Sequence, residues 1–198
     1  MNSNFFNRRI VNIDITHRCA LECPRCPRQT LYRNKNLPVP GEDISLRDFE
    51  LVLDFMDEID FEGQLSDPVH HPLFVDFLKR CYETNTDVEI HNASSVRSKK
   101  WYREAFAANP NALWVFSIDG LPEQSHTYRI NQDGVKLFEI MKESVSLLNT
   151  KPCWQYIVFN YNEDSIYKAV EMAASIGVKF YLLQTSRWNG DSDPLMPS

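Results

Sequence analysis

The stretch IVNIDITHRCALECPRC, residues 10–26, joins a short apolar run to three cysteines. Cys19, Cys23 and Cys26 stand within eight residues, and no fourth cysteine lies nearby in the sequence. A closed zinc site or an ordinary iron-sulfur cluster takes four protein ligands. The residues around this stretch must therefore indicate what supplies the missing ligand.

The size and composition of the chain are those of a globular protein. Of its 198 residues, 43% are apolar and 12% aromatic, enough for a sizeable core in one large domain or two small ones. The formal charge of −6 supplies no overall basic field, so a nucleic-acid partner is not favoured. Five cysteines are an odd number for a disulfide framework and fit a metal site in a reducing compartment better.

The sequence carries no membrane or export signal that we recognise. No segment approaches the roughly 20 continuous apolar residues that span a bilayer. The first ten residues, MNSNFFNRRI, lack an apolar core followed by a small-residue cleavage site. We therefore expect a cytoplasmic protein with no membrane partner.

Short apolar runs alternate with longer segments of helical periodicity, a pattern typical of parallel strands joined by crossover helices. The predicted strands are residues 10–16, 59–64, 87–92, 113–119, 154–160 and 179–185.

Five helices are predicted between these strands from their apolar stripes and end signals. Ser45 and Asp133 are predicted N-caps, Pro72 a first helical residue, and Gly177 a left-handed C-cap. The stripes are Leu46, Phe49, Val52, Leu53 and Met56; Phe74, Phe77, Leu78 and Cys81; Trp101, Tyr102, Ala105 and Phe106; Leu137, Phe138, Met141, Val145 and Leu148; and Ile166, Ala169, Val170 and Ala173.

The order of these elements predicts an α/β fold, a partial, open TIM-type barrel of about six parallel strands with crossover helices, or (βα)6. It falls short of the eight strands and roughly 250 residues of a complete barrel. We assign residues 1–188 to this one domain and residues 189–198 to a flexible C-terminal tail.

Polar side chains follow every predicted strand. In such folds the loops at the carboxyl ends of the strands face a common mouth, so these side chains are candidates for one site. They are His17 and Cys19; Gln64 and Asp67; His91, Asn92 and Ser94; Ser117 and Asp119; Asn160; and Gln184, Ser186 and Arg187.

The cysteine spacing permits two kinds of metal site. Three converging thiolates can hold a cubane iron-sulfur cluster with one iron left open. The alternative is structural zinc bound by the same cysteines and His17, since Cys3His is a common zinc ligand set.

At this point the chain resembles the radical S-adenosylmethionine (radical SAM) superfamily, whose CxxxCxxC signature is matched by Cys19, Cys23 and Cys26. The resemblance runs from about residue 10 to residue 188 and is to a short form, without a C-terminal auxiliary-cluster domain. It implies a 4Fe-4S cluster whose open iron binds S-adenosyl-L-methionine. In that family the reduced cluster splits the cofactor to a deoxyadenosyl radical, which abstracts a hydrogen atom from the substrate.

The resemblance also implies cofactor-binding residues. GQLSDPVHHP, residues 63–72, resembles the family's glycine-rich loop, with Asp67 facing the cofactor's ammonium group. The segments IHNASS, residues 90–95, and FSIDG, residues 116–120, resemble later strand-end motifs. On the same resemblance the further cofactor contacts are Asn92, Ser94, Ser117, Asn160 and Arg25, the last in place of the family's usual apolar residue.

Substrate contacts are assigned from chemistry and position. Arg129 and Arg187 carry planar guanidinium groups on strand-end loops and suit a carboxylate or phosphate. His71 is a further candidate, although it also suits a simple junction between loop and helix. We do not assign the residue that performs the chemical step.

The sequence therefore predicts a radical SAM enzyme acting on a peptide or protein side chain or on a small metabolite. A glycyl-radical-enzyme activase is one alternative, and a non-catalytic zinc or redox-sensing iron-sulfur module is another. Arg18, Arg25, Arg28, Arg33 and Lys35 gather beside the cysteines, and this patch suits an acidic electron donor such as flavodoxin or ferredoxin.

Overall fold

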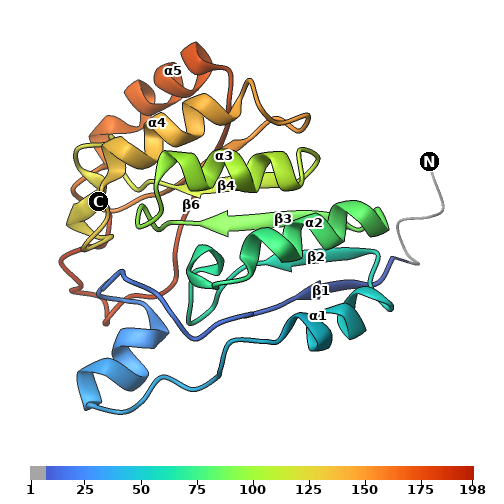
Figure 1. Ribbon diagram of the computed structural model, residues 1–198. Helices are drawn as coiled ribbons and strands as arrows, with labels where there is room; N and C mark the ends of the chain where they lie inside the picture. The colour runs from blue at the N-terminus through green and yellow to red at the C-terminus, as the bar shows by residue number, and fades with distance from the viewer. Residues whose placement is uncertain (1–7) are drawn as a thin grey trace.

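A computed structural model describes residues 8–198. Six strands form one parallel sheet in the order β1-β2-β3-β4-β5-β6, which follows the order of the chain (Figure 1). The strands are β1 (Ile10–Asn12), β2 (Glu58–Phe61), β3 (Asp87–Asn92), β4 (Leu113–Ser117), β5 (Cys153–Ile157) and β6 (Lys179–Leu183). This open α/β sheet confirms the predicted partial barrel.

Five α-helices connect the strands: α1 (Leu46–Leu53), α2 (Phe74–Thr84), α3 (Lys99–Ala108), α4 (Gly134–Ser144) and α5 (Ile166–Ile176). The caps at Ser45 and Asp133 are confirmed, since each side chain accepts a hydrogen bond from the backbone three residues later. Gly177 ends α5 with a φ of 80°. The prediction for Pro72 is wrong: α2 begins at Phe74, because the His71 ring accepts the Leu73 amide and holds the preceding turn.

The two faces of the sheet have different chemistry because side chains alternate along each strand. Phe61, Ile90 and Trp114 form one row across three strands, fully buried beneath the helices. The side chains between them point to the open, concave face of the sheet. On that face lie Glu58, Asp60, Glu89, His91, Ser117 and Gln155.

The strands are shorter than predicted at their carboxyl ends: β4 stops at Ser117 and β5 at Ile157. At these ends, side chains take the place of backbone groups in the hydrogen bonds between strands. For example, the Asp119 carboxylate accepts a hydrogen bond from the Ile157 amide at 2.8 Å. The strand ends therefore continue as loops that carry the polar groups. All these loops gather at the side of the sheet to which the strand arrows point (Figure 1).

The C-terminal segment was predicted to be a flexible tail, but it makes specific contacts in the structure. The backbone amide of Asn160 donates to the Leu195 carbonyl at 3.1 Å. Trp188 and Leu195 pack with the apolar cluster beside Cys23 and Cys26. The segment after β6 therefore forms part of the wall around the strand ends.

Candidate active site

A cavity of ≈ 370 Å³ opens at the carboxyl ends of the strands. This volume lies in the range of small-molecule binding sites. Its lining residues come from the loops after β1, β2, β3, β4 and β6 and from the strands β3 to β6 themselves, and all three clustered cysteines are among them. The polar and charged lining residues used below are Arg28, Glu62, Asp67, Ser117, Arg129, Gln155 and Arg187.

The cysteine loop is held by its own backbone. The Cys26 amide donates to the Cys23 carbonyl at 3.0 Å, and the Cys26 carbonyl accepts the amides of Gln29 and Thr30. A short π-helical turn, Arg28–Tyr32, follows directly, and π-helical turns are frequent at functional sites. All five cysteines are free, so none of the three is held in a disulfide.

The environment of the thiols suits a positively charged metal core. Burial raises the pKa of the Cys19 thiol to about 12 and that of Cys23 to about 11, although the charge of Arg129 opposes the shift at Cys23. A buried thiolate therefore needs a cation to compensate it, and bound iron or zinc supplies this by displacing the proton. The donor set fits a metal centre.

The loop after β2 is clamped into a tight turn over the cavity. The Asp14 carboxylate accepts the backbone amides of Gln64 and Leu65 at 3.0 and 3.3 Å. Gly63 is required there, since a Cβ at this position would stand 2.2 Å from the Ser66 carbonyl oxygen. Residues 62–67, which include this turn, line the cavity.

Asp67 lies at the end of this loop, but its carboxylate is already occupied. One oxygen accepts the Val69 amide at 3.2 Å, and the other accepts the amides of Ala93 and Ser94, both at 2.8 Å. Asp67 lines the cavity with only 4% of its surface exposed. The structure therefore shows Asp67 joining two loops at the cavity wall, with each carboxylate oxygen accepting at least one backbone amide.

Asn92 and Ser94 are likewise engaged within the protein. The Asn92 amide nitrogen donates to the Tyr102 hydroxyl at 2.7 Å, and its oxygen accepts the Ser94 amide at 2.9 Å. The Ser94 hydroxyl lies 3.0 Å from Nε2 of His70. Both residues are buried, and neither lines the cavity, so the structure does not place their side chains at a ligand.

Arg129 does face the cavity, held there by a buried partner. Its Nε donates to Oδ2 of Asp119 at 2.7 Å, and the Asp119 side chain is completely buried. The Arg129 side chain is 13% exposed. Burial acts to lower the Arg129 pKa, but the Asp119 charge raises it, so the group stays cationic. The terminal amino groups of Arg129 make no hydrogen bond within residues 8–198 and are available to an anion.

Ser117 lines the same cavity, at the end of β4. Its hydroxyl accepts a hydrogen bond from the Gln155 side chain at 3.2 Å, and both residues line the cavity. Arg187 also lines the cavity, from the exposed loop after β6. The structure therefore brings Ser117, Arg129 and Arg187 together with the three cysteines.

Three further predicted residues lie outside the cavity lining. His71 is buried, with its ring between the Ile44 carbonyl and the Leu73 amide. Asn160 holds the C-terminal segment through the Pro194 carbonyl, and Arg25 pairs with Asp193 at 2.6 Å. Each of these side chains is used in fixing a loop, so none is placed against a ligand.

Gln155 lines the cavity and escaped the sequence analysis as a ligand contact. Gln155 stands inside the apolar run WQYIVFN at a position where alternation points the side chain to the open face. A polar residue within an apolar strand, at a position that faces the open side of the sheet, is a signal that could have indicated a ligand contact. The Tyr128 ring stacks on Phe159 with 4.2 Å between centroids beside the cysteine loop, and no spacing rule relates these two residues.

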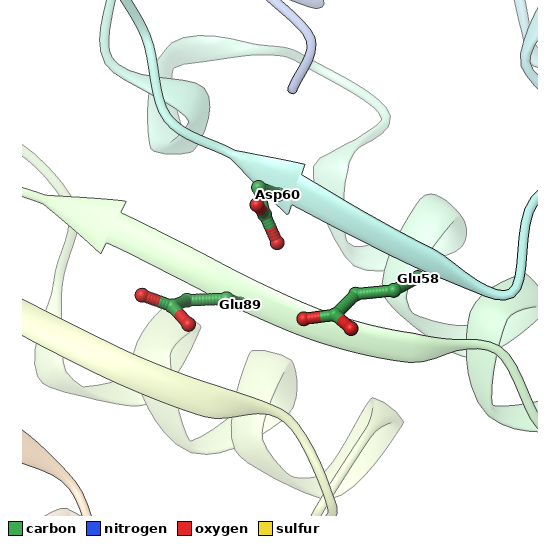
Figure 2. A group of neighbouring side chains, drawn as sticks. All are labelled: Glu58, Asp60 and Glu89. Carbon is green, nitrogen blue, oxygen red and sulfur yellow. The ribbon is translucent and has the colours of Figure 1, made fainter. Parts of the chain in front are cut away.

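Deeper on the concave face, three carboxylates gather between β2 and β3 (Figure 2). Each of Glu58, Asp60 and Glu89 contributes one carboxylate oxygen, and these three oxygens lie within 4.8 Å of one another. Arg8 pairs with Glu58 at 3.2 Å and His91 with Glu89 at 2.8 Å, whereas Oδ1 of Asp60 is buried without a partner. Burial and the negative charges of Glu58 and Glu89 raise the Asp60 pKa to about 6.

Sequence comparisons give a short match. No family model matches the chain. An 88-residue stretch is 31% identical to proteins described as probable alpha-galactosidase C of Aspergillus flavus and Aspergillus oryzae. The match takes in 43% of this chain, which spans only 11% of the length of those proteins. It does not carry their activity to this chain.

Solved structures give a much longer match. Streptococcus suis SuiB bound to S-adenosylmethionine matches 96% of the chain with a TM-score of 0.76 and 15% identity, and SuiB bound to its precursor peptide SuiA matches 94% with 0.74 and 14%. A radical SAM methyltransferase from Sphaerobacter thermophilus matches 96% with 0.60 and 11%. The chain spans 44%, 41% and 59% of these structures.

The TM-scores show that the chain shares the fold of these proteins, and at identities of 11–15% the match shows the fold alone. The chain therefore has the fold of radical SAM enzymes, which confirms at that level the resemblance seen in the cysteine motif. In the described residues, no helix is long and apolar enough to cross a membrane.

Proposed function

We propose that this chain is a radical SAM enzyme that binds a 4Fe-4S cluster through Cys19, Cys23 and Cys26 and S-adenosyl-L-methionine in the adjoining cavity. The observation that carries the proposal is that the three thiols line one cavity at the strand ends of a radical SAM fold. When bound, the cluster and cofactor supply a deoxyadenosyl radical that removes a hydrogen atom from a substrate. The chain contributes binding, orientation and exclusion of water.

The spacing of the three cysteine sulfur atoms favours an iron-sulfur cluster over a single zinc ion. Zinc with bonds of about 2.3 Å to sulfur draws its thiolates to roughly 4 Å from one another. Within residues 8–198, the one group of three potential ligand atoms gathered within 4.8 Å is the carboxylate group Glu58, Asp60 and Glu89, not the thiols. Three thiols further apart suit the larger inorganic core of a cluster.

The cavity supplies complementary groups for an amino-acid cofactor. The free amino groups of Arg129 suit a carboxylate, because a guanidinium offers two parallel donors to it. Ser117 lines the same cavity, and so does the loop held by Asp14. We assign Arg129 to the cofactor or substrate carboxylate and Arg187, on the outer loop, to the substrate.

The open concave face favours a peptide or protein side chain as substrate. Six strands leave the barrel incomplete beside β6, where Tyr181, Leu182 and Leu183 are each at least 40% exposed. A wide entrance admits a segment of polypeptide more readily than a closed barrel does. One structural neighbour, SuiB, is bound to a precursor peptide, which supports the same choice.

Hydrolysis of a sugar, suggested by the short sequence match, has less support. Glycoside hydrolysis requires two carboxyl groups that flank the scissile bond. Of the residues that line the cavity, Glu62 and Asp67 are the acids, and both oxygens of Asp67 accept backbone amides. That leaves one available carboxylate in the cavity.

The test is anaerobic reconstitution with iron and sulfide, followed by addition of S-adenosyl-L-methionine and dithionite. We expect about four irons per chain, a reduced-cluster electron paramagnetic resonance spectrum that changes on cofactor binding, and formation of deoxyadenosine. Cys23→Ser removes all three signals, whereas Cys153→Ala, at the opposite end of β5, keeps them. Stoichiometric zinc without deoxyadenosine would contradict the proposal and favour a structural metal site.

A further inference from the structure

Strand β6 is the last strand of the sheet, and its outer edge pairs with no other strand within residues 8–198. The Leu183 carbonyl accepts the Val158 amide at 2.9 Å, so Leu183 turns its backbone groups toward β5. Because backbone groups point to alternate sides along a strand, those of Phe180 and Leu182 point away from β5. In the described part of the chain, neither of these two residues has a backbone hydrogen-bond partner on that outer side.

We propose that an extended, acidic segment of a substrate peptide adds to the sheet as a further strand along the outer edge of β6. The inference rests on the proposed function, because it takes the substrate to be a polypeptide, and it names how the chain holds that substrate. Free N–H and C=O groups on a strand edge are the groups that bind peptides by strand addition. Bonds to these groups supply affinity, while the side chains and charges beside them supply selectivity.

The edge of β6 leads directly to the candidate active site. Leu183, the last residue of β6, lines the cavity, and so do the four residues that follow it, 184–187. The three clustered cysteines line the same cavity. Since a strand rises only about 3.3 Å per residue, a peptide paired with Leu182 has its neighbouring residues at the cavity. Strand addition would therefore hold one segment of the substrate while the adjoining segment meets the site.

Apolar side chains of β6 are left partly uncovered on both faces of the sheet. On the concave face, Tyr181 is 40% exposed and Leu183 42%, and on the helix face Leu182 is 48% exposed. By contrast Tyr156, the neighbour of Leu182 in β5, is fully buried. The side chains of an added strand would pack beside these residues, as cross-strand neighbours do in a sheet.

The charge around this edge favours an acidic peptide. The segments that carry β5 and β6, residues 149–160 and 177–190, contain Lys151, Lys179 and Arg187 and no acidic residue, a net charge of +3 in a chain of −6. All three basic side chains are exposed, and none forms a salt bridge in the described part of the chain. They are therefore available to the acidic side chains of a partner.

The same charges disfavour a second copy of this chain as the occupant of the edge. Lysine on an edge strand is a common protection against pairing between identical edges. Pairing of β6 with β6 of another molecule would bring two basic segments together, whereas an acidic peptide neutralises one of them. An acidic peptide with apolar residues in an extended run is thus the partner that fits.

The binding test uses the full chain without iron or cofactor, and the fluorophore-labelled peptide EVTVTVE as the probe. Its matched controls are the same peptide N-methylated at its central amides, which cannot donate hydrogen bonds, and the charge-reversed peptide KVTVTVK. By fluorescence anisotropy, we expect each control to have a Kd higher on the order of tenfold. The effect of charge reversal should shrink in 0.5 M salt, because salt screens exposed charges, whereas the effect of N-methylation should persist.

Two variants of the chain locate the binding at β6. Leu182→Pro removes the outward N–H, which an edge strand tolerates, and Leu182→Ala removes the side chain but keeps that N–H as a matched control. We expect the proline variant to bind EVTVTVE more weakly than the alanine variant. Amide hydrogen exchange followed by nuclear magnetic resonance needs no variant: the peptide should slow exchange at Phe180 and Leu182 in the wild type.

Equal Kd values for EVTVTVE and its N-methylated form would overturn the strand addition, and so would unchanged exchange at Phe180 and Leu182. A dimer of the chain that Leu182→Pro dissociates would overturn it in favour of a second copy. If these measurements fail while the reconstituted protein still forms deoxyadenosine, the strand addition alone is wrong. Absence of deoxyadenosine from the reconstituted protein would instead contradict the proposed function.

Discussion

The carboxylate of Asp67 accepts the backbone amide of Ser94 at 2.8 Å and so joins the loop after β2 to the loop after β3. The same oxygen accepts the Ala93 amide, and the other accepts that of Val69. A buried carboxylate with three backbone donors stabilises the empty protein, whatever ligand later binds.

Asp67→Asn should therefore destabilise the protein in the absence of cofactors. An amide group in this place turns a donor toward at least one backbone N–H, and we expect a loss of about 2 kcal/mol or more in the free energy of unfolding. Urea denaturation of the metal-free protein measures it. Asp164→Asn, at an exposed acid before α5, serves as control and should stay within about 0.5 kcal/mol of wild type. If the stability of the variant is unchanged and its cofactor binding is weaker, Asp67 acts as the sequence predicts, through contact with the cofactor's ammonium group.

The pair formed by Asp119 and Arg129 should matter for both folding and binding. Asp119→Asn leaves the arginine charge largely buried without compensation, and we expect a loss of about 3 kcal/mol in stability. Arg129→Lys keeps the charge but loses the planar fork, so its main effect should be weaker S-adenosyl-L-methionine binding. Denaturation and calorimetry distinguish the two effects. Glu143→Gln, which breaks a pair with Arg103 at the surface, should cost much less stability.

The ion pair of Arg25 and Asp193 links the cysteine loop to a segment 168 residues away in sequence. Asp193 also accepts the amides of Asn189 and Leu195, so Asp193→Ala should release the C-terminal segment from the loop. We expect the reconstituted variant to lose iron to a chelator faster than wild type. Asp191→Ala, at an exposed acid of the same segment, should retain iron normally. Equal rates of iron loss in the two variants would show that the segment does not support the loop.

Asp60 gives stability a pH dependence opposite to that of most carboxyl groups. Its pKa in the folded protein is about 6, above the usual value of 3.8, so the folded state holds the proton more tightly than the unfolded chain does. Stability from this group is therefore present below pH 3.8 and is lost as the pH rises through 6. At neutral pH, the ionised group destabilises the fold.

Asp60→Asn should accordingly stabilise the protein at pH 7.5, by about 1 kcal/mol once solvent screening of this partly exposed group is considered. The gain should shrink toward zero near pH 4, where both proteins are neutral at this position. Thermal unfolding across this pH range measures the difference. A gain that is the same at both pH values would show that charge repulsion among Glu58, Asp60 and Glu89 is not its source.

Most of the scaffold is determined by local sequence. Strand residues alternate between a face that packs under helices and a face that stays open, and the caps at Ser45, Asp133 and Gly177 depend on neighbours within a few residues. The cysteine spacing is local as well, since Cys19, Cys23 and Cys26 belong to one loop. These features could be predicted because each depends on interactions between residues close in the chain.

The roles of the polar residues were decided by the tertiary structure. Asp67, Asn92, Asn160 and Arg25 stand at positions that suit a ligand, but their partners are backbone or charged groups from other loops, brought near only by the fold. Loops packed around a cavity bury backbone amides and carbonyls, and each buried group needs a hydrogen-bond partner. Those polar side chains meet this need within the protein, whereas Ser117, Arg129 and Arg187 line the cavity.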